Sequence, residues 1–356
     1  MHDRHRTDRE RWSLRGPVRA CTLRRTWSAC GANGQCGTDT RSDTAHVEFD
    51  RAGALTLHRH ENHDGSAWAS IREYDASGRL LAERYGVADE LANTSIYEYD
   101  TAGRVQRLIR RADGRDRVAE TYEYTTDGLK QKTQYPEIPE QVGCGAIHWT
   151  VEGTDVSYSA DGAAAIVLRY DHREQPVEAT FMGRDGRMLT RVSLTYDERG
   201  LLVDETQTIL EVVLPEDALA QIPAPELAKL QAVFGGGRVQ AHRVHRYNAD
   251  GRRIETTSKM FGGLGEDRQT RDYNERGDQV QEILESNHRS GSLAENGELV
   301  DDSGSPKTYR SEARFAYDYD SHGNWVKKMV EGRSDPNADF SVSTIETREI
   351  EYYSAS

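Results

Sequence analysis

Apolar and polar residues alternate along much of this chain with a period of two. Runs such as 96–99 (Ile-Tyr-Glu-Tyr) and 121–124 (Thr-Tyr-Glu-Tyr) place aromatic or β-branched residues at every second position. Successive side chains of a β-strand point to opposite faces of a sheet, so this pattern predicts strands. Short mixed runs that follow each turn signal, such as 201–203, predict the returning strands.

One motif separates the strands: an aromatic residue, then Asp, Asn, Ser or Thr, two free positions and Gly. Eight of the 17 tyrosines occupy its first position, and the first four glycines recur every 25 residues. Asp or Asn at the start of a turn can accept backbone hydrogen bonds, and Gly adopts the positive φ that hairpin turns need. The residues that we assign to these structural turns are Tyr74, Asp75, Gly78, Tyr99, Asp100, Gly103, Tyr196, Asp197, Gly200, Tyr247, Asn248, Gly251, Tyr273, Asn274, Gly277, Tyr319, Asp320 and Gly323.

The 25-residue unit fits two strands and two turns, which predicts an all-β protein. We expect an antiparallel β-hairpin repeat sheet, curled into a strip or a partial shell, over residues 43–356. Three segments break the repeat and are interpreted as insertions, at 136–155, 206–238 and 286–312. The second holds the only helical pattern, ended by three glycines, and predicts one small helical insertion.

Residues 1–42 differ from the rest of the chain. They are rich in Arg, hold three of the four cysteines, and contain no apolar stretch of the length that a signal peptide needs. We predict a disordered leader, or a segment that precedes the true start of the protein.

Charge and composition exclude two classes of function. The net charge of −14 argues against a nucleic-acid partner. No apolar run approaches the roughly 18 residues of a membrane-spanning helix, so no transmembrane segment is expected. Leu, Ile, Val and Phe make up 63 of the 356 residues, and together with the high net charge this low share favours disorder. The repeat overrides that indication for the sheet and leaves it in place for the leader.

The densest group of metal-ligating side chains is His58, His60 and His63, followed by Asp64. On a strand His58 and His60 project to one face, and three imidazoles with a carboxylate can hold a divalent metal. The alternative is a set of exposed polar residues, because Arg59 interrupts the group at a solvated strand end. We therefore expect no metal or other cofactor, and keep the three histidines as the candidate ligands.

No Asp or Glu stands apart from the turn and surface residues, and no nucleophile motif is present. No catalytic residue is therefore assigned, and the chain is expected not to be an enzyme. The motif tyrosines are expected to form a ladder that stabilises the sheet. Aromatic residues outside the motif are freer to contact a ligand, and the candidate binding residues are Trp68, Tyr97, Tyr122, Trp149 and Trp325.

Several copies of the motif have nearly the same residues. They read YDASGR at 74–79, YDTAGR at 99–104, YDERGL at 196–201, YNADGR at 247–252 and YDSHGN at 319–324. These copies resemble the YD repeats of the bacterial RHS family and of the related animal teneurins, and the resemblance covers roughly residues 45–353. It implies a β-sheet strip that forms a shell in large members, where it encloses a toxin or serves cell-surface contact and carbohydrate binding.

From this resemblance we expect a non-enzymatic YD/RHS-type repeat protein that presents a binding surface to carbohydrate or to another polypeptide. The resemblance also implies a location at the cell envelope or outside the cell. Two alternatives stay open: an accessory or remnant shell piece of an RHS-type toxin-delivery system, and a glycan-acting enzyme with unassigned acids. The oligomeric state is not predicted.

Overall fold

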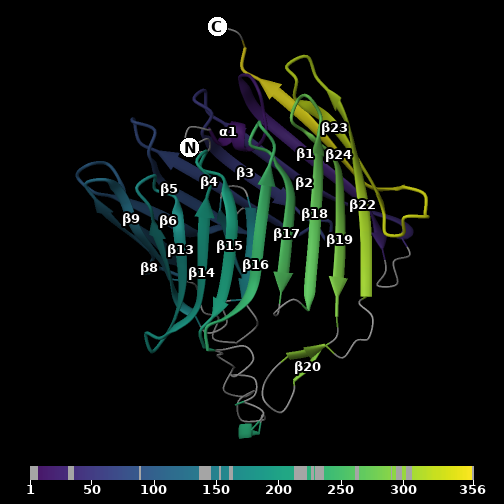
Figure 1. Cartoon of the computed structure of the whole chain (residues 1–356). Coiled ribbons are helices and arrows are strands. Elements are labelled where there is room, and N and C mark those ends of the chain that lie inside the picture. The colour runs from purple at the N-terminus through teal and green to yellow at the C-terminus, as the bar shows by residue number, and fades with distance from the viewer. Residues whose placement is uncertain are drawn as a thin grey trace. The chain divides into compact units, whose positions relative to one another are not determined.

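The chain is all-β and antiparallel, as the alternating pattern predicted (Figure 1). The computed structural model describes residues 7–30, 36–87, 90–135, 146–151, 154–159, 163–211, 223–225, 228, 236–260, 264–289, 291–293, 299–301 and 307–354. Twenty strands belong to one sheet, and four short strands form two separate two-stranded sheets. The described residues divide into two compact units, each treated by itself: unit 1 covers 119–272 and 283–310, and unit 2 covers the remainder.

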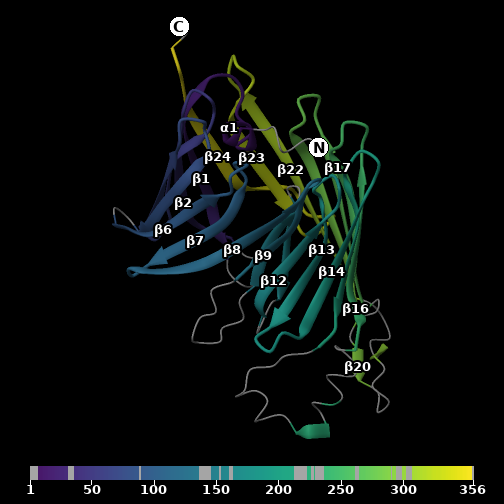
Figure 2. The same cartoon turned by 90° about the vertical axis from the view of Figure 1, so that its left-hand side faces the viewer.

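Unit 2 contains a short helix and ten strands in an unbroken antiparallel order. They are α1 Asp8–Arg11, β1 Val18–Cys30, β2 Cys36–Phe49, β3 Leu55–Glu61, β4 Ala67–Tyr74, β5 Leu80–Val87, β6 Glu90–Tyr99, β7 Val105–Ala112, β23 Trp325–Arg333, β24 Ser341–Tyr352 and most of β22 Lys307–Tyr319. The pairing order is β22-β23-β24-β1-β2-β3-β4-β5-β6-β7. The C-terminal strand β24 therefore lies beside the N-terminal strand β1 (Figure 2).

The prediction of a disordered leader does not describe residues 7–30, which the structure places in α1 and β1. Strand β1 pairs with β2 on one side and with β24 on the other. Thr22 lies opposite His46 of β2, and Leu23 lies opposite Arg348 of β24. Leu14 and Val18 are 2% and 0% exposed and contribute to the apolar core of this unit. The leader is ordered because its partners lie in the sheet domain, including a strand from the far end of the chain.

Unit 1 is built from consecutive hairpins. Its strands are β9 Gly128–Gln134, β10 Ala146–Val151, β11 Thr154–Ser159, β12 Ala163–Tyr170, β13 Pro176–Gly183, β14 Met188–Tyr196, β15 Leu202–Ile209, β16 Arg238–Tyr247, β17 Arg253–Met260, β20 Gly291–Leu293, β21 Leu299–Asp301, and parts of β8 Arg115–Thr125, β18 Gly265–Tyr273 and β19 Gln279–His288. The order β8-β9-β12-β13-β14-β15-β16-β17-β18 is antiparallel throughout. Its apolar core is a cluster around Phe181, Val192 and Leu202.

The predicted insertions are only partly covered. Residues 136–145 and 152–153 of the first, and most of 212–235 in the second, lie outside the described residues, and with them the predicted helical insertion. The one helix whose bounds the structure gives is the four-residue α1. Strands β20 and β21 pair with each other within the third insertion. Among the helices of the described ranges, none has both the length and the apolar character needed to cross a bilayer.

The motif turns that begin with Asp or Asn are closed by the same pair of backbone hydrogen bonds. At one copy the Asp75 N–H donates to the carbonyl of Arg79 at 2.9 Å, and the Gly78 N–H donates to the carbonyl of Asp75 at 3.0 Å. The Asp75 carboxylate accepts the N–H of Ser77 at 2.8 Å, and Gly78 has a φ of 81°. Turns with the same two bonds begin at Asp50, Asp100, Asp171, Asp197, Asn248, Asn274 and Asp320.

The motif tyrosines link one turn to another through their hydroxyl groups. Four of them donate to the carbonyl of the residue two positions after the end of an earlier turn, which joins neighbouring hairpins, whereas the Tyr319 hydroxyl donates to the Asp278 carboxylate at 2.7 Å. These bonds run from Tyr74 to Leu55 at 2.9 Å, from Tyr99 to Leu80 at 2.7 Å, from Tyr196 to Pro176 at 2.7 Å and from Tyr247 to Leu202 at 2.7 Å. The repeated position of these tyrosines predicted a role for their rings, and the role of the hydroxyl was not predicted.

Replacing Tyr99 with phenylalanine is expected to lower the free energy of unfolding by about 1 kcal/mol, because a half-buried carbonyl loses its donor while the ring stays. Urea unfolding followed by circular dichroism measures this change. The same substitution at Tyr309, which is 50% exposed, is the control and should change stability by less than about 0.5 kcal/mol. Equal effects at both positions would show that the hydroxyl of Tyr99 contributes nothing specific.

Candidate functional site

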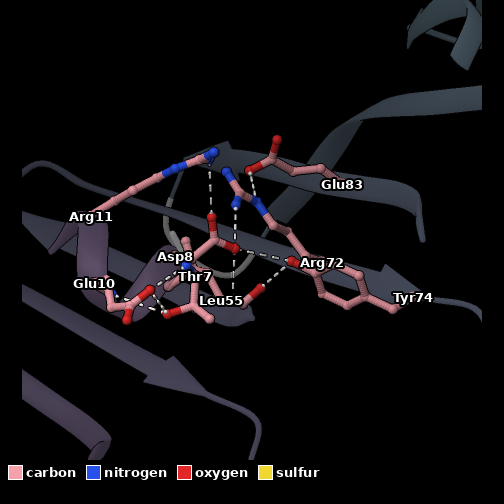
Figure 3. A network of polar contacts seen from close by, with 8 residues as sticks. All are labelled: Thr7, Asp8, Glu10, Arg11, Leu55, Arg72, Tyr74 and Glu83. Atoms are coloured by element: carbon pink, nitrogen blue, oxygen red, sulfur yellow. Dashed lines mark hydrogen bonds and ion pairs between the residues drawn. The ribbon is translucent and has the colours of Figure 1, made fainter. Parts of the chain in front are cut away.

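A single carboxylate fixes the N-terminal turn to the sheet of unit 2 (Figure 3). Oδ2 of Asp8 accepts the backbone N–H of Leu55 at 2.9 Å and lies 3.5 Å from both the Arg72 guanidinium and the Tyr74 hydroxyl. Arg72 also donates to Glu83 at 3.2 Å, so it lies between two carboxylates. Asp8 thus connects helix α1 directly to β3 and β4, and through Arg72 to β5.

The helix itself begins with a capping box. The Thr7 hydroxyl accepts the N–H of Glu10 at 3.3 Å, and the Glu10 side chain accepts the N–H of Thr7 at 2.7 Å. These bonds satisfy two donors that a helix start otherwise leaves unpaired. The result is a rigid first turn that ends at Trp12, whose carbonyl accepts a bond from Arg348 at 3.1 Å.

Trp12 packs against a row of rings on the sheet. Its centroid lies 5.3 Å from that of His58, which in turn lies 4.5 Å from Trp68, both with edge-on geometry. His60, two residues after His58, stacks on Trp68, with ring centroids 6.0 Å apart and ring planes at 23°. We call Trp12, His58, His60 and Trp68 the Trp–His patch.

The strand register places these side chains together. His60 is directly opposite Trp68, and His58 is opposite Ser70, so all four lie on one face of β3 and β4. Ser70 is 4% exposed, whereas Trp68 next to it on this face is 38% exposed. A large indole thus remains open to solvent beside buried neighbours.

The charges of His58 and of Arg72 beside it set the electrostatics of the patch. Burial, followed by the neighbouring His60 and Arg72, lowers the pKa of His58, which favours its neutral imidazole at neutral pH. The guanidinium of Arg72 is balanced by Glu83 and Asp8. The arrangement suits stacking against a ring and offers no strong attraction for a small ion.

The predicted metal ligands do not converge. His58 and His60 both pack on Trp68, and Nε2 of His60 lies 3.0 Å from the Asn62 side-chain oxygen. His63 contacts Trp27 instead, with ring centroids 5.9 Å apart. Within the described ranges, no group of three or more His, Cys, Asp or Glu is placed to hold a metal ion.

The other predicted binding residues are dispersed. Tyr97 lies on the same face of unit 2 as Trp68. Arg72, on that face of β4, is opposite Glu83 of β5, and Glu83 is opposite Ser95 of β6, which is two residues before Tyr97. Tyr122 belongs to unit 1, where its hydroxyl donates to Glu120. The remaining two predicted binding residues, Trp325 and Trp149, lie in different elements.

Trp325 is 8% exposed, and the guanidinium carbon of Arg348 lies 3.5 Å from its ring centroid, so it is a packed residue of unit 2. Trp149 lies in β10, and its side chain is outside the described part of the structure. Sequence reasoning missed Trp12, Trp27 and Arg72. The Thr7-x-x-Glu10 spacing was the one available signal that an ordered turn precedes Trp12.

Comparisons with known proteins give no family. No family model matches the chain, and no curated protein matches it either. Similar solved structures include a porin-like protein from Bacteroides uniformis, with 10% identity, a TM-score of 0.36, and coverage of 95% of this chain and 98% of that one. A porin-like protein from Bacteroides vulgatus has 10% identity, a TM-score of 0.25, and coverage of 95% and 99%. Salmonella typhi OmpF in complex with daunomycin has 10% identity, a TM-score of 0.27, and coverage of 94% and 96%. At these TM-scores no function passes from them to this chain.

These comparisons correct the assignment made from the turn motif. The RHS/YD-repeat assignment is wrong, because no family model supports it. The roles that it implied are withdrawn with it: carbohydrate, polypeptide or cell-surface binding, and a piece of a toxin-delivery system. The alternative of a glycan-acting enzyme, which rested only on unassigned acidic residues, is withdrawn as well. The motif is a turn signal, set by the chemistry of Asp, Asn and Gly in hairpins, and it did not identify a family.

The prediction of no transmembrane segment is corrected as well. It rested on the absence of helix-length apolar runs, a criterion that does not apply to strands. The prediction of no nucleic-acid partner stays a prediction.

Proposed function

We propose that this chain is a non-enzymatic binding protein that holds a flat aromatic small molecule against Trp68. The observation that carries the proposal is the 38% exposure of this indole on a face where its neighbour Ser70 is 4% exposed. We keep the cell envelope as the proposed location, which agrees with the porin-like description of two similar structures.

The surroundings of Trp68 support a planar ligand. His58 and His60 pack on the indole at 4.5 and 6.0 Å and restrict its rotation, so little conformational entropy is lost on binding. Trp12 extends the row of rings beyond His58, and the first helical turn holds it in place. Aromatic rings pack face to face or edge to face with such ligands, and this packing adds binding free energy beyond that from apolar burial.

The uncharged His58 and the paired Arg72 set the expected ligand class. His58 stays uncharged near neutral pH, and Arg72 is already paired with Glu83 and Asp8. We therefore expect an uncharged heteroaromatic ring to bind with an affinity that changes less than about twofold between low and high salt.

Fluorescence titration of the full chain with riboflavin, an uncharged tricyclic ring, tests the proposal. We expect saturable quenching of tryptophan emission, and Trp68→Leu should weaken the affinity at least about fivefold through loss of the stacking partner. Tyr309→Leu removes an aromatic ring of similar exposure in unit 1 and serves as the matched control. Circular dichroism confirms that each variant is folded.

Two outcomes would refute the proposal. One is the absence of saturable binding of riboflavin, and of adenosine as a second probe, up to about 1 mM. The other is unchanged affinity in Trp68→Leu with the quenching intact, which would place the ligand elsewhere.

A further inference from the structure

Residues Thr7–Trp12 form a segment that is held on unit 2 by polar contacts and by the ring of Trp12. We call this segment the N-terminal strap. None of its residues is buried, whereas Leu14, two residues beyond it, is 2% exposed. Segments with few buried apolar contacts can open locally while the rest of a fold stays intact. Leu14 therefore marks the boundary between the core of unit 2 and a segment that can detach from it.

The backbone between the strap and this boundary has an uncommon conformation. Ser13 has a φ of 56°, in the left-handed region that residues other than glycine seldom adopt. Its N–H donates to the carbonyl of Glu10 at 2.9 Å, and the N–H of Leu14 donates to the carbonyl of Arg9 at 3.1 Å, which closes the helical turn. Opening at this residue releases the left-handed conformation, so Ser13 is the hinge position of the strap.

Asp8 links the strap to the sheet. Its carboxylate accepts the N–H of Leu55 at 2.9 Å and lies 3.5 Å from the guanidinium of Arg72 (Figure 3). Hydrogen bonds to a charged group are stronger than those between neutral groups, and Arg72 is itself positioned by Glu83. One side chain of the strap thus connects it to β3 and to β4.

The turn that contacts the strap leaves room for it. Gly53 has a φ of 92°, and a Cβ placed on it would lie 2.9 Å from the Cβ of Thr7. The N–H of Arg9 also donates to the carbonyl of Gly53 at 3.1 Å. Gly78, which has the same place in another motif turn, has a φ of 81° and no heavy atom within 4 Å of such a Cβ. Gly53 therefore serves the close approach of the strap as well as its own turn.

We propose that the N-terminal strap opens and closes, carrying Trp12 out of the Trp–His patch and back, with Asp8 as its latch, and that an aromatic ligand on the patch holds it closed. The closed strap places the ring centroid of Trp12 5.3 Å from that of His58, and Arg348 donates to the Trp12 carbonyl at 3.1 Å. A ligand that contacts Trp12 must favour closure, because binding and closure are linked. The role of the ligand rests on the proposed function, whereas the latch does not.

Hydrogen exchange of the Arg9 amide, followed by NMR on the full chain, measures opening of the strap. This N–H donates to Gly53 and not to Asp8, so its exchange reports movement of the strap backbone. Asp8→Ala should speed the exchange at least about tenfold, because the strap loses a hydrogen bond to a charged group. The N–H of Asp50 donates to the carbonyl of Ala54 within the turn, and its rate should not change.

Asp335→Ala is the matched control for Asp8→Ala. The Asp335 carboxylate accepts the N–H of Asn337 at 2.8 Å in an exposed loop of unit 2, so the substitution removes the same kind of bond away from the strap. Exchange of the Arg9 amide should keep its original rate. An Arg9 rate that Asp8→Ala leaves unchanged, or that both substitutions change equally, would overturn the latch.

Two glycine substitutions test the strap without altering Asp8. Gly53→Ala places a methyl group against Thr7, whereas Gly78→Ala brings the same unfavourable φ to a turn with open space. In fluorescence titration, riboflavin affinity should be at least about threefold weaker in Gly53→Ala and within about twofold of the original in Gly78→Ala. Circular dichroism checks the fold of each variant. Equal affinities in the two variants would overturn the role of the strap in binding.

The coupling between ligand and strap acts through Trp12. Saturating riboflavin should slow exchange of the Arg9 amide at least about fivefold in the unaltered chain. Trp12→Leu should weaken riboflavin binding at least about threefold, and adding Asp8→Ala to it should weaken binding no further, because the latch acts by placing Trp12. Additive losses would show that Asp8 affects the ligand by another route and would overturn its role as a latch for Trp12.

Failure of this inference is distinguishable from failure of the proposed function. Riboflavin that binds in a Trp68-dependent manner but leaves the Arg9 exchange rate unchanged would overturn the coupling and support the proposed function. The absence of riboflavin binding would refute the proposed function and the role of the ligand, and the effect of Asp8→Ala on Arg9 exchange would still decide whether Asp8 is a latch.

Discussion

Replacing Arg243 with methionine is expected to lower the free energy of unfolding by about 3 to 5 kcal/mol. The substitution removes the only partner that the described structure gives the carboxylate of Glu205, which is 1% exposed, and leaves an uncompensated buried charge. Chemical denaturation followed by circular dichroism measures the change. A large loss would show that the buried Glu205–Arg243 pair contributes to the stability of unit 1.

Arg246→Met is the matched control, because Arg246 is three residues further on the same strand, has a 70% exposed side chain and lies 3.8 Å from Glu255. Its loss should cost less than about 1 kcal/mol, as for most exposed ion pairs. In the double variant Arg243→Met/Glu205→Leu, stability should recover substantially, since the unpaired charge is gone. A double variant as unstable as Arg243→Met would show that lost packing, and not the buried charge, causes the effect.

Truncating Leu14 to alanine is expected to lower the free energy of unfolding by about 2 to 5 kcal/mol. Leu14 is 2% exposed and packs with Val18, Phe49 and Leu55 in the core of unit 2, so the shorter side chain leaves a cavity. The expectation depends on the N-terminal segment being part of the folded unit.

Leu81→Ala is the control for this change, because Leu81 is 41% exposed and the same atoms are removed. It should alter stability by less than about 1 kcal/mol. Equal, small effects of the two substitutions would restore the disordered leader that composition favoured and contradict the placement of β1 between β24 and β2.

Local chemistry made the hairpins predictable. The strand runs and the turns at Asp75, Asp100 and Asp197 could be located from the sequence because each depends on residues within five positions of one another. The all-β antiparallel class follows from those elements. The same local signal misled the family assignment, since a good turn motif recurs wherever hairpins do.

Long-range pairing was not predictable. Strand β1 is ordered by partners in β2 and in β24, the latter more than 300 residues away, and nothing in residues 18–30 alone identifies them. An Arg-rich segment with little apolar content resembles a disordered one until its partners are known. Composition alone therefore predicted disorder for residues 18–30 and for both units, and this prediction was wrong in each case.

The candidate site and the buried Glu205–Arg243 pair show the same division. His58 and His60 could be placed on one face from their spacing, but their packing on Trp68 required the register of β3 against β4. Glu205 and Arg243 are 38 residues apart, on either side of an insertion, so their pairing was not visible in the sequence. Chemistry that depends on which strands are neighbours appears only once the sheet is known.

The indole NMR signals of the full chain test the central claim most directly. The chain has five tryptophans, whose Nε1–H resonances can be assigned by single Trp→Phe substitutions. On adding riboflavin, we predict shifts of the Trp68 and Trp12 signals and an unmoved signal from Trp325, which is buried beneath Arg348. An unmoved Trp68 signal at saturating riboflavin would contradict the account.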